Sequence, residues 1–179
     1  WSHDLGFNWQ PAAFVYVDIA AFWSDYWDLI EPEPNANQVI QFINVTRARI
    51  TGIESMIKLF LHRTVMVDLS YTFMDPRDLD LEQVLAYRPR HIAKVALNWR
   101  YHNLELGADY RYISRFENVK VYPMDNRVAQ KVMNARISWH VQPVILSLDV
   151  NNLFNYNYVQ MERNLEPIRH YVLTLSGTF

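Results

Sequence analysis

Histidines and acidic side chains are the residues in this sequence whose types could support catalysis or metal binding. The six histidines are scattered along the chain, at His3, His62, His91, His102, His140 and His170. None belongs to the i, i+4 pair of a helical zinc site or to a His-Glu-x-x-His pattern. The sequence has no cysteine, no Gly-x-Ser-x-Gly turn and only four glycines. It therefore predicts no enzyme, no cofactor and no metal centre.

One acidic set could in principle hold Ca²⁺ through oxygen ligands. It consists of Asp75, Asp78, Asp80 and Glu82. Its spacing matches no defined calcium loop. A solvated loop neutralised by Arg77, Arg88 and Arg90 is the favoured interpretation.

The composition excludes several classes of protein. The net charge is −2, and no basic run or base-stacking motif favours nucleic-acid binding. No apolar run approaches the roughly 18 residues of a membrane helix. Aromatic residues make up 15% of the chain. Trp1 already lies within an alternating pattern, so we expect the numbered chain to begin inside a larger protein.

Alternation of apolar and polar residues predicts the elements that must position any site. In the last stretch, Tyr171, Leu173, Leu175 and Phe179 share one parity, and the residues between them are mostly hydroxylic. Successive strand side chains point to opposite faces, so this stretch is predicted as a strand. The same pattern predicts about nine strands, near residues 1–10, 13–24, 41–60, 65–73, 93–101, 104–112, 133–141, 144–151 and 171–179.

The third strand contains a change of phase at Gly52. Before it, Arg47, Arg49 and Thr51 form the polar parity; beyond it, Glu54 and Lys58 do. A glycine at a phase slip is typical of a β-bulge, so we predict a bulge there.

The connections between these strands alternate between short and long. The short ones are near residues 10–11, 61–63, 102–103 and 142–143, and the long ones near 31–37, 74–90, 113–126 and 155–169. Prolines at 32 and 34 exclude a central strand in the first long connection. Outer-membrane barrels show this asymmetry, with short periplasmic turns and long outer loops. The predicted fold class is therefore all-β, an antiparallel segment of a transmembrane β-barrel.

The two predicted strand faces differ in charge. One parity carries essentially no charge, and the other carries Asp4, Asp18, Arg47, Arg49, Glu54, Lys58, Asp68, Lys94, Arg100, Glu105, Asp109, Arg111, Arg136 and Asp149. Aromatic residues cluster at the strand ends, as in the two interfacial girdles of a spanning barrel. Those predicted at the upper ends are Trp23, Tyr26, Trp27, Tyr71, Phe73, Tyr110, Tyr112, Phe154 and Tyr171, and those at the lower ends are Trp9, Trp99, Tyr101, Trp139 and Phe179.

Several segments resemble one family of outer-membrane proteins. The ending Pro167-Ile-Arg-His-Tyr-Val-Leu-Thr-Leu-Ser-Gly-Thr-Phe179, preceded by Val150-Asn-Asn-Leu-Phe-Asn155 and Tyr158, resembles the carboxyl-terminal signature of TonB-dependent outer-membrane receptors. The segments 44–54, 87–91 and 28–30 also resemble recurrent barrel segments of that family. Together they extend over nearly the whole chain in the expected order.

The resemblance implies a larger protein in the bacterial outer membrane. It implies a barrel of about 22 strands with a globular plug inside. Residues 1–179 would be the carboxyl-terminal part of that barrel, with the plug and the amino-terminal strands outside this chain. The implied partners are outer-membrane lipid, the TonB complex through the absent amino-terminal region, a transported ligand and the barrel-assembly machinery, which would read Tyr171, Leu173, Leu175 and Phe179 as an assembly signal.

Transport of a scarce nutrient, such as a siderophore or cobalamin, is the function that the resemblance implies. The outer loops would supply ligand contacts from Trp27, Arg88, Arg90, Phe116, Tyr122, Tyr156, Tyr158 and Arg163. Aromatic rings and guanidinium groups suit stacking and anion contacts with an organic ligand. For any single one of these residues, loop packing or interfacial anchoring is the plainer interpretation.

Two rival interpretations stay open at the level of sequence. One is a passive porin or a small closed barrel of eight strands, from Ala12 to Phe179, with a structural or adhesive role. The other is a soluble antiparallel sandwich, which also alternates along its strands. A sandwich would bury the apolar faces of two stacked sheets against each other.

Overall fold

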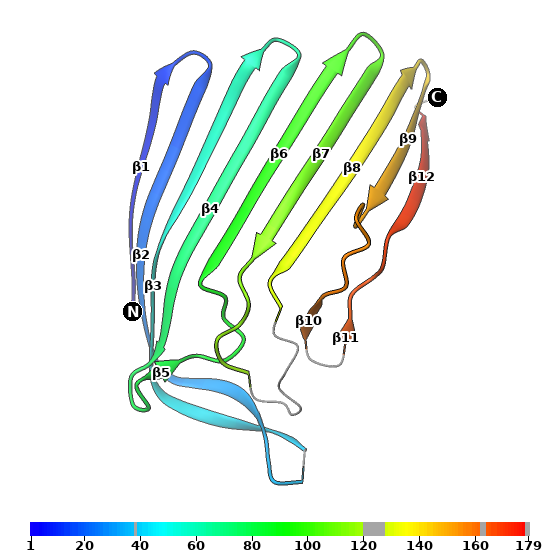
Figure 1. Cartoon of the computed structure of the whole chain (residues 1–179). Helices are drawn as coiled ribbons and strands as arrows, with labels where there is room; N and C mark the ends of the chain where they lie inside the picture. The colour runs from blue at the N-terminus through cyan, green and yellow to red at the C-terminus, as the bar shows by residue number, and fades with distance from the viewer. Residues whose placement is uncertain (38, 120–127, 162–163, 178–179) are drawn as a thin grey trace.

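The computed structural model describes residues 1–37, 39–119, 128–161 and 164–177 (Figure 1). These residues form twelve β-strands: β1 (Ser2–Ala12), β2 (Val15–Pro34), β3 (Ile40–His62), β4 (Val65–Asp78), β5 (Gln83–Val84), β6 (His91–Tyr101), β7 (Leu104–Ile113), β8 (Gln130–Val141), β9 (Val144–Asn151), β10 (Val159–Met161), β11 (Asn164–Leu165) and β12 (His170–Gly177). Within the same residues, no helix is long and apolar enough to cross a membrane.

The principal strands form one antiparallel sheet in sequence order. Its order is β1-β2-β3-β4-β6-β7-β8-β9-β12, which confirms the nine-strand prediction; β5 adds to β4, and β10 pairs with β11 in a separate hairpin. Figure 1 shows the short turns gathered at one end of the sheet and the long connections at the other. In the described residues the sheet is open, with β1 and β12 as its edges. No second layer covers it there, so the sandwich interpretation has no support.

Cross-strand partners share a face, and the register sorts the side chains into rows. One row across five strands is Trp99, Leu106, Ile137, Leu148 and Leu173. The next row, on the opposite face, is Arg100, Glu105, Ser138, Ser147 and Thr174. We call these two surfaces the apolar face and the polar face. The apolar face is solvent-exposed over wide areas, with Trp139 56% and Leu173 70% exposed.

The few buried apolar side chains lie toward the long-loop end. Among the described residues they are Ala48, Leu85, Ala86, Val132 and Tyr158, together with the fully buried Pro76. The sheet therefore has no internal core of its own. Its packed regions lie where loops fold back on the strand ends.

The first long connection is partly a strand, which the sequence interpretation missed. The β2–β3 ribbon continues to the pairs Pro32 with Phe42 and Pro34 with Ile40. Proline lacks an N–H donor and is tolerated at a strand edge that pairs on one side only. Here β1 ends its pairing at Ser24, so the far part of β2 pairs only with β3. Figure 1 shows this ribbon extending beyond the body of the sheet.

The predicted bulge at Gly52 is wrong. Gly52 pairs with Phe22 on one side and Met74 on the other, and both ladders keep their register through it. A Cβ at this position would collide with the Phe22 ring and with the Phe73 carbonyl oxygen. Glycine is therefore required for a close approach, since the aromatic ring lies where a side chain would be.

Continuous register also corrects the faces assigned to the start of β3. Arg47, Arg49 and Thr51 have the same parity as Ile53, so they lie on the apolar-face side rather than with Glu54 and Lys58. Their strand partners are Trp27, Asp25 and Trp23. The change of phase in the sequence marks the level at which this side of the sheet stops being apolar, not a kink in the strand.

Aromatic side chains gather near both ends of the apolar face. Toward the short turns, Trp99 stacks on Tyr101 with ring centroids 5.8 Å apart, and Trp139 is exposed nearby. Toward the long loops, Tyr71 donates to or accepts from His91 Nδ1 at 2.8 Å. Tyr26 differs from the prediction because it pairs with Ala48 and so lies on the polar-face side. Phe179 lies outside the described residues.

Candidate functional site

The loop between β4 and β6 is tied to the sheet by arginines. Arg88 Nη2 lies 3.0 Å from Glu31 Oε1 on the β2–β3 ribbon, and the Glu31 side chain is only 12% exposed. Arg90 Nη1 lies 2.7 Å from Asp75 Oδ1, and its Nε lies 2.6 Å from Glu117 Oε1. These ion pairs tie the loop to β2, to β4 and to the connection after β7, so the two arginines help to set the loop arrangement.

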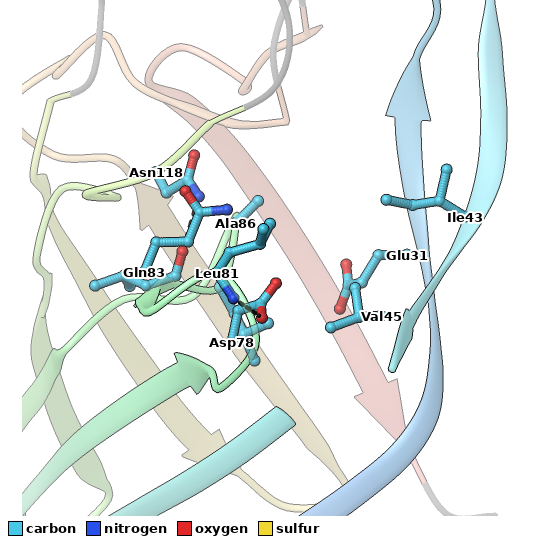
Figure 2. A pocket seen from close by; sticks show the side chains of 10 residues that line it. Glu31, Ile43, Val45, Asp78, Leu81, Gln83, Ala86 and Asn118 are labelled. Carbon is cyan, nitrogen blue, oxygen red and sulfur yellow. Dashed lines mark hydrogen bonds between the residues drawn. The ribbon is translucent and has the colours of Figure 1, made fainter. Parts of the chain in front are cut away.

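A small cavity separates the ribbon from this loop (Figure 2). Its volume is about 70 Å³, and it is lined by Glu31, Ile43, Val45, Asp78, Leu81, Gln83, Val84, Leu85, Ala86 and Asn118. Figure 2 shows Glu31 and Val45 on the ribbon opposite Asp78 at the end of β4 and Leu81 and Ala86 on the loop. Ligand pockets for organic molecules measure roughly 300 to 1,000 Å³. This cavity is too small for such a ligand, and it marks where the ribbon packs on the loop.

Two members of the acidic set, Asp75 and Asp78 at the end of β4, are engaged within the protein. Asp75 Oδ1 accepts from both Arg77 Nε, at 3.0 Å, and Arg90 Nη1. Asp78 is buried, and its Oδ1 accepts the backbone N–H groups of Asp80 and Leu81, both at 2.9 Å. Among the described residues, no group of three acidic or histidine side chains could hold a metal ion. Arg77 and Arg90 neutralise Asp75, whereas Arg88 pairs with Glu31 instead.

The predicted loop aromatics are split between two places. Phe116 meets Tyr87 edge to face, with centroids 6.2 Å apart, in the same region as Arg88 and Arg90. Tyr156 and Tyr158 stack on each other at 6.4 Å, and the Tyr156 hydroxyl donates to the Ala129 carbonyl at 2.8 Å. Tyr158 is only 7% exposed. The structure therefore groups Arg88, Arg90 and Phe116 and packs the two tyrosines against the start of β8.

The remaining predicted contact residues lie apart from that group. Trp27 is 53% exposed on β2, on the apolar-face side and opposite Arg47. Tyr122 and Arg163 lie outside the described residues. Tyr171, Leu173 and Leu175 lie on the apolar face of β12, and these residues are 63%, 70% and 70% exposed.

Asn152 is a structural residue whose role the sequence interpretation missed. Asn152 is 3% exposed, and its Nδ2 donates to the carbonyls of Tyr156, at 2.9 Å, and Pro167, at 3.2 Å. Its Oδ1 accepts the Tyr156 N–H at 2.8 Å. Its φ of 52° lies in the left-handed region that asparagine tolerates. The Asn-Asn-Leu-Phe-Asn run was the available signal, because asparagine favours local side chain to backbone hydrogen bonds.

Paired charges form a band across the polar face. Arg100 Nη2 lies 2.7 Å from Glu105 Oε2, and Arg136 Nε lies 2.6 Å from Asp149 Oδ1. The Asn134 amide donates to Asp109 at 3.2 Å. Each of these pairs joins neighbouring strands, so the ionic groups belong to a wall network. They do not converge on one point, as the groups of a catalytic site would.

Comparison with known proteins places this architecture in a family. A family model described as TonB dependent receptor-like, beta-barrel, matches residues 1–153. The copper transporter OprC has a similar structure, with a TM-score of 0.81 and 18% identity over 99% of this chain and 31% of OprC. A mutant of the ferric enterobactin receptor from Pseudomonas aeruginosa gives a TM-score of 0.79 and 18% identity over 99% of this chain and 31% of that receptor.

A third similar structure is the ferric-catecholate import receptor Fiu from K12 E. coli, with a TM-score of 0.74 and 20% identity over 97% of this chain and 27% of Fiu. At such identities the likeness shows the fold alone, and this chain spans less than a third of each of these proteins. The neighbours are named as transporters and receptors rather than as enzymes. The family match over most of the chain is the finding that classifies it, and the chain belongs to the TonB-dependent receptor-like β-barrel family, a family of the outer membrane.

Proposed function

We propose that residues 1–179 are the carboxyl-terminal part of the barrel of a TonB-dependent outer-membrane receptor, which takes up a scarce ligand across the outer membrane. The observation that carries this proposal is that one open sheet, which matches the barrel of the family, has an apolar face and a polar face. Hydrocarbon would wet the apolar face, and the paired charges of the polar face would line the interior. The plug and the remaining strands would belong to the rest of the protein.

The names of the similar structures support a proposal for the ligand class. The names of the three similar structures mention copper, ferric enterobactin and ferric catecholates. A metal carried by an organic chelator is therefore the cargo that we propose first, within the wider class of siderophores, cobalamin and other organic nutrients. TonB would supply the energy through the amino-terminal region, and the barrel-assembly machinery would recognise β12.

Ligand contacts would come from the long-loop end. We propose contacts from Trp27, Arg88, Arg90, Phe116, Tyr122, Tyr156, Tyr158 and Arg163. Of these, Arg88, Arg90 and Phe116 have the strongest support, because they lie in one loop region and combine guanidinium groups with an aromatic edge. Tyr156 and Tyr158 would act mainly by fixing the last long loop.

Uptake by cells tests the proposal. Cells that depend on the full-length receptor should accumulate a radiolabelled ferric chelate, and deletion of the TonB protein should abolish that accumulation. A passive pore would admit the same chelate without TonB, and a small closed barrel would admit none because side chains fill its interior. Either result would overturn energised transport.

A further inference from the structure

Charged and aromatic side chains meet on the apolar-face side of the sheet at the long-loop end. Three successive rows contain them: Trp23, Thr51 and Asp75; then Asp25, Arg49 and Arg77; then Trp27 and Arg47. The row before them, Ala21, Ile53 and Phe73, is apolar. We call Trp23, Asp25, Trp27, Arg47, Arg49, Asp75 and Arg77 the outer-rim cluster. Its charges therefore begin directly where the apolar band of this face ends.

Hydrogen bonds and a cation–π contact hold part of the cluster together. Arg49 Nε donates to Asp25 Oδ1 at 2.6 Å, and its guanidinium lies 4.3 Å from the centre of the Trp23 ring. The Trp23 indole N–H donates to Asp25 Oδ2 at 3.0 Å. The bonds from Arg49 and then from Trp23 keep the pKa of the Asp25 carboxyl below its usual range. Asp25 thus stays ionised and fixes Arg49 over the tryptophan.

The cluster has more guanidinium groups than carboxylates. Asp75 Oδ1 is shared between Arg77, at 3.0 Å, and Arg90, at 2.7 Å. Arg47 is exposed and makes no ion pair with any residue that the structure describes. Arg77 retains 42% exposure of its side chain. Arg47 and Arg77 therefore present donors that the protein itself does not fully use.

We propose that the outer-rim cluster binds the phosphate groups of membrane lipid headgroups, which rests on the proposed function because the apolar face must lie in a bilayer. Trp23 and Trp27, 45% and 53% exposed, lie on the same side as the arginines, and tryptophan favours the membrane interface. Guanidinium groups at that depth face phosphate, which their planar fork binds through two hydrogen bonds. The two rings would place the arginines at the depth of the lipid headgroups, which favours lipid phosphate over a free anion in solution.

Native mass spectrometry of the full-length receptor tests this inference. The probe is lipid A with two phosphates, compared with its dephosphorylated form. Arg47→Ala/Arg77→Ala removes the two underused guanidinium groups and leaves Asp75 paired with Arg90. Each cation near a lipid surface contributes roughly 1 kcal/mol, so the double variant should bind the phosphorylated lipid about tenfold or more weakly. Wild type should bind the dephosphorylated lipid as weakly as the variant does.

Arg63→Ala is the control, because Arg63 is an exposed arginine in the short turn between β3 and β4, at the other end of the sheet. It should bind the phosphorylated lipid as wild type does. Equal binding by the double variant and wild type, or by the two lipid forms, would overturn the inference. Insertion of the receptor into vesicles and uptake of its ligand are scored separately. If the receptor inserts and takes up its ligand, but the double variant binds the phosphorylated lipid as wild type does, only this inference fails. If the receptor does not insert, the proposed function fails with it.

Discussion

At the scale of single residues, Gly52 shows how one missing side chain can be a packing requirement. The Phe22 ring occupies the space over Gly52, between two ladders that keep their register. An aromatic ring over a glycine in the neighbouring strand stabilises a sheet position that glycine alone would weaken. The residue that looked like a defect in the pattern is therefore a contact point.

Gly52→Ala should destabilise the full-length receptor by about 1 to 3 kcal/mol, the usual cost of overpacking. The added methyl group would meet the Phe22 ring and the Phe73 carbonyl oxygen, and the carbonyl belongs to the backbone. Urea titration followed by tryptophan fluorescence measures the free energy of unfolding. Gly107→Ala is the matched control, because its Cβ would meet nothing nearer than 3.5 Å. Equal stability of the two variants would contradict the steric explanation.

A second prediction at the residue scale concerns Asn152 and the last long loop. Asn152→Ala leaves the Tyr156 N–H without its side-chain acceptor and the carbonyls of Tyr156 and Pro167 without their side-chain donor. Each buried group left unsatisfied costs about 1 to 3 kcal/mol. Limited proteolysis of the intact receptor should therefore cut residues 155–169 faster than in wild type. Asn157→Ala changes an exposed asparagine in the same loop, and it should be cut at the wild-type rate.

At the scale of the element, each strand separates two environments. Along β6, Leu97 lies in a row with Val67 and Ala108, whereas Asn98 lies in a row with Met66 and Gly107. Successive residues thus belong to different faces, and a shift by one residue would exchange them all. Charge on the apolar face would be placed in hydrocarbon, which fixes the register of every strand in a bilayer.

Leu97→Arg should destabilise the receptor in lipid vesicles by roughly 2 to 4 kcal/mol, the cost of arginine on a lipid-facing surface near the bilayer midplane. The neighbouring Asn98→Arg should cost much less, because it faces the polar side beside Gly107. The folded fraction is measured by the mobility difference between heated and unheated samples on electrophoresis. A larger loss for Asn98→Arg would reverse the assignment of the faces.

At the scale of the whole molecule, the open sheet leaves two edge strands. β1 pairs only with β2, and β12 pairs only with β9. An unpaired edge cannot face hydrocarbon, because its backbone N–H and C=O groups would lack partners. The remaining strands of the barrel would supply hydrogen-bond partners for both edges. This agrees with the comparisons, because the chain spans less than a third of the length of each similar structure.

Residues 1–179 expressed alone should fail to insert as a monomer into vesicles and should aggregate through their edges. The full-length receptor should insert under the same conditions. Resistance to alkaline extraction, together with heat-dependent mobility, distinguishes the two. Efficient monomeric insertion of residues 1–179 would favour a barrel that closes on itself, and it would weaken the assignment to a larger one.

The sequence by itself determined the nine principal strands, the alternation of short and long connections and the two faces over most of the sheet, but not the short strands β5, β10 and β11. Alternation with period 2 is a local property, and rows such as Trp99 with Leu106 keep it across many strands. Those candidate contact residues that the structure describes were also assigned to the long-loop end of the sheet, although their role in ligand binding stays a prediction. Arg88, Arg90 and Phe116 were assigned to that end because the long connections are polar and their position follows from strand direction.

The tertiary structure alone decided what the departures from the pattern mean. A change of parity looks the same in sequence whether a strand bulges or leaves an apolar band, and only the cross-strand register of Gly52 distinguishes the two. The contacts of Arg88 with Glu31 and of Asn152 with Pro167 join segments far apart along the chain. Such contacts depend on how loops fold over strand ends. Local periodicity does not encode this, because periodicity specifies which face a side chain lies on and not which distant residues it contacts.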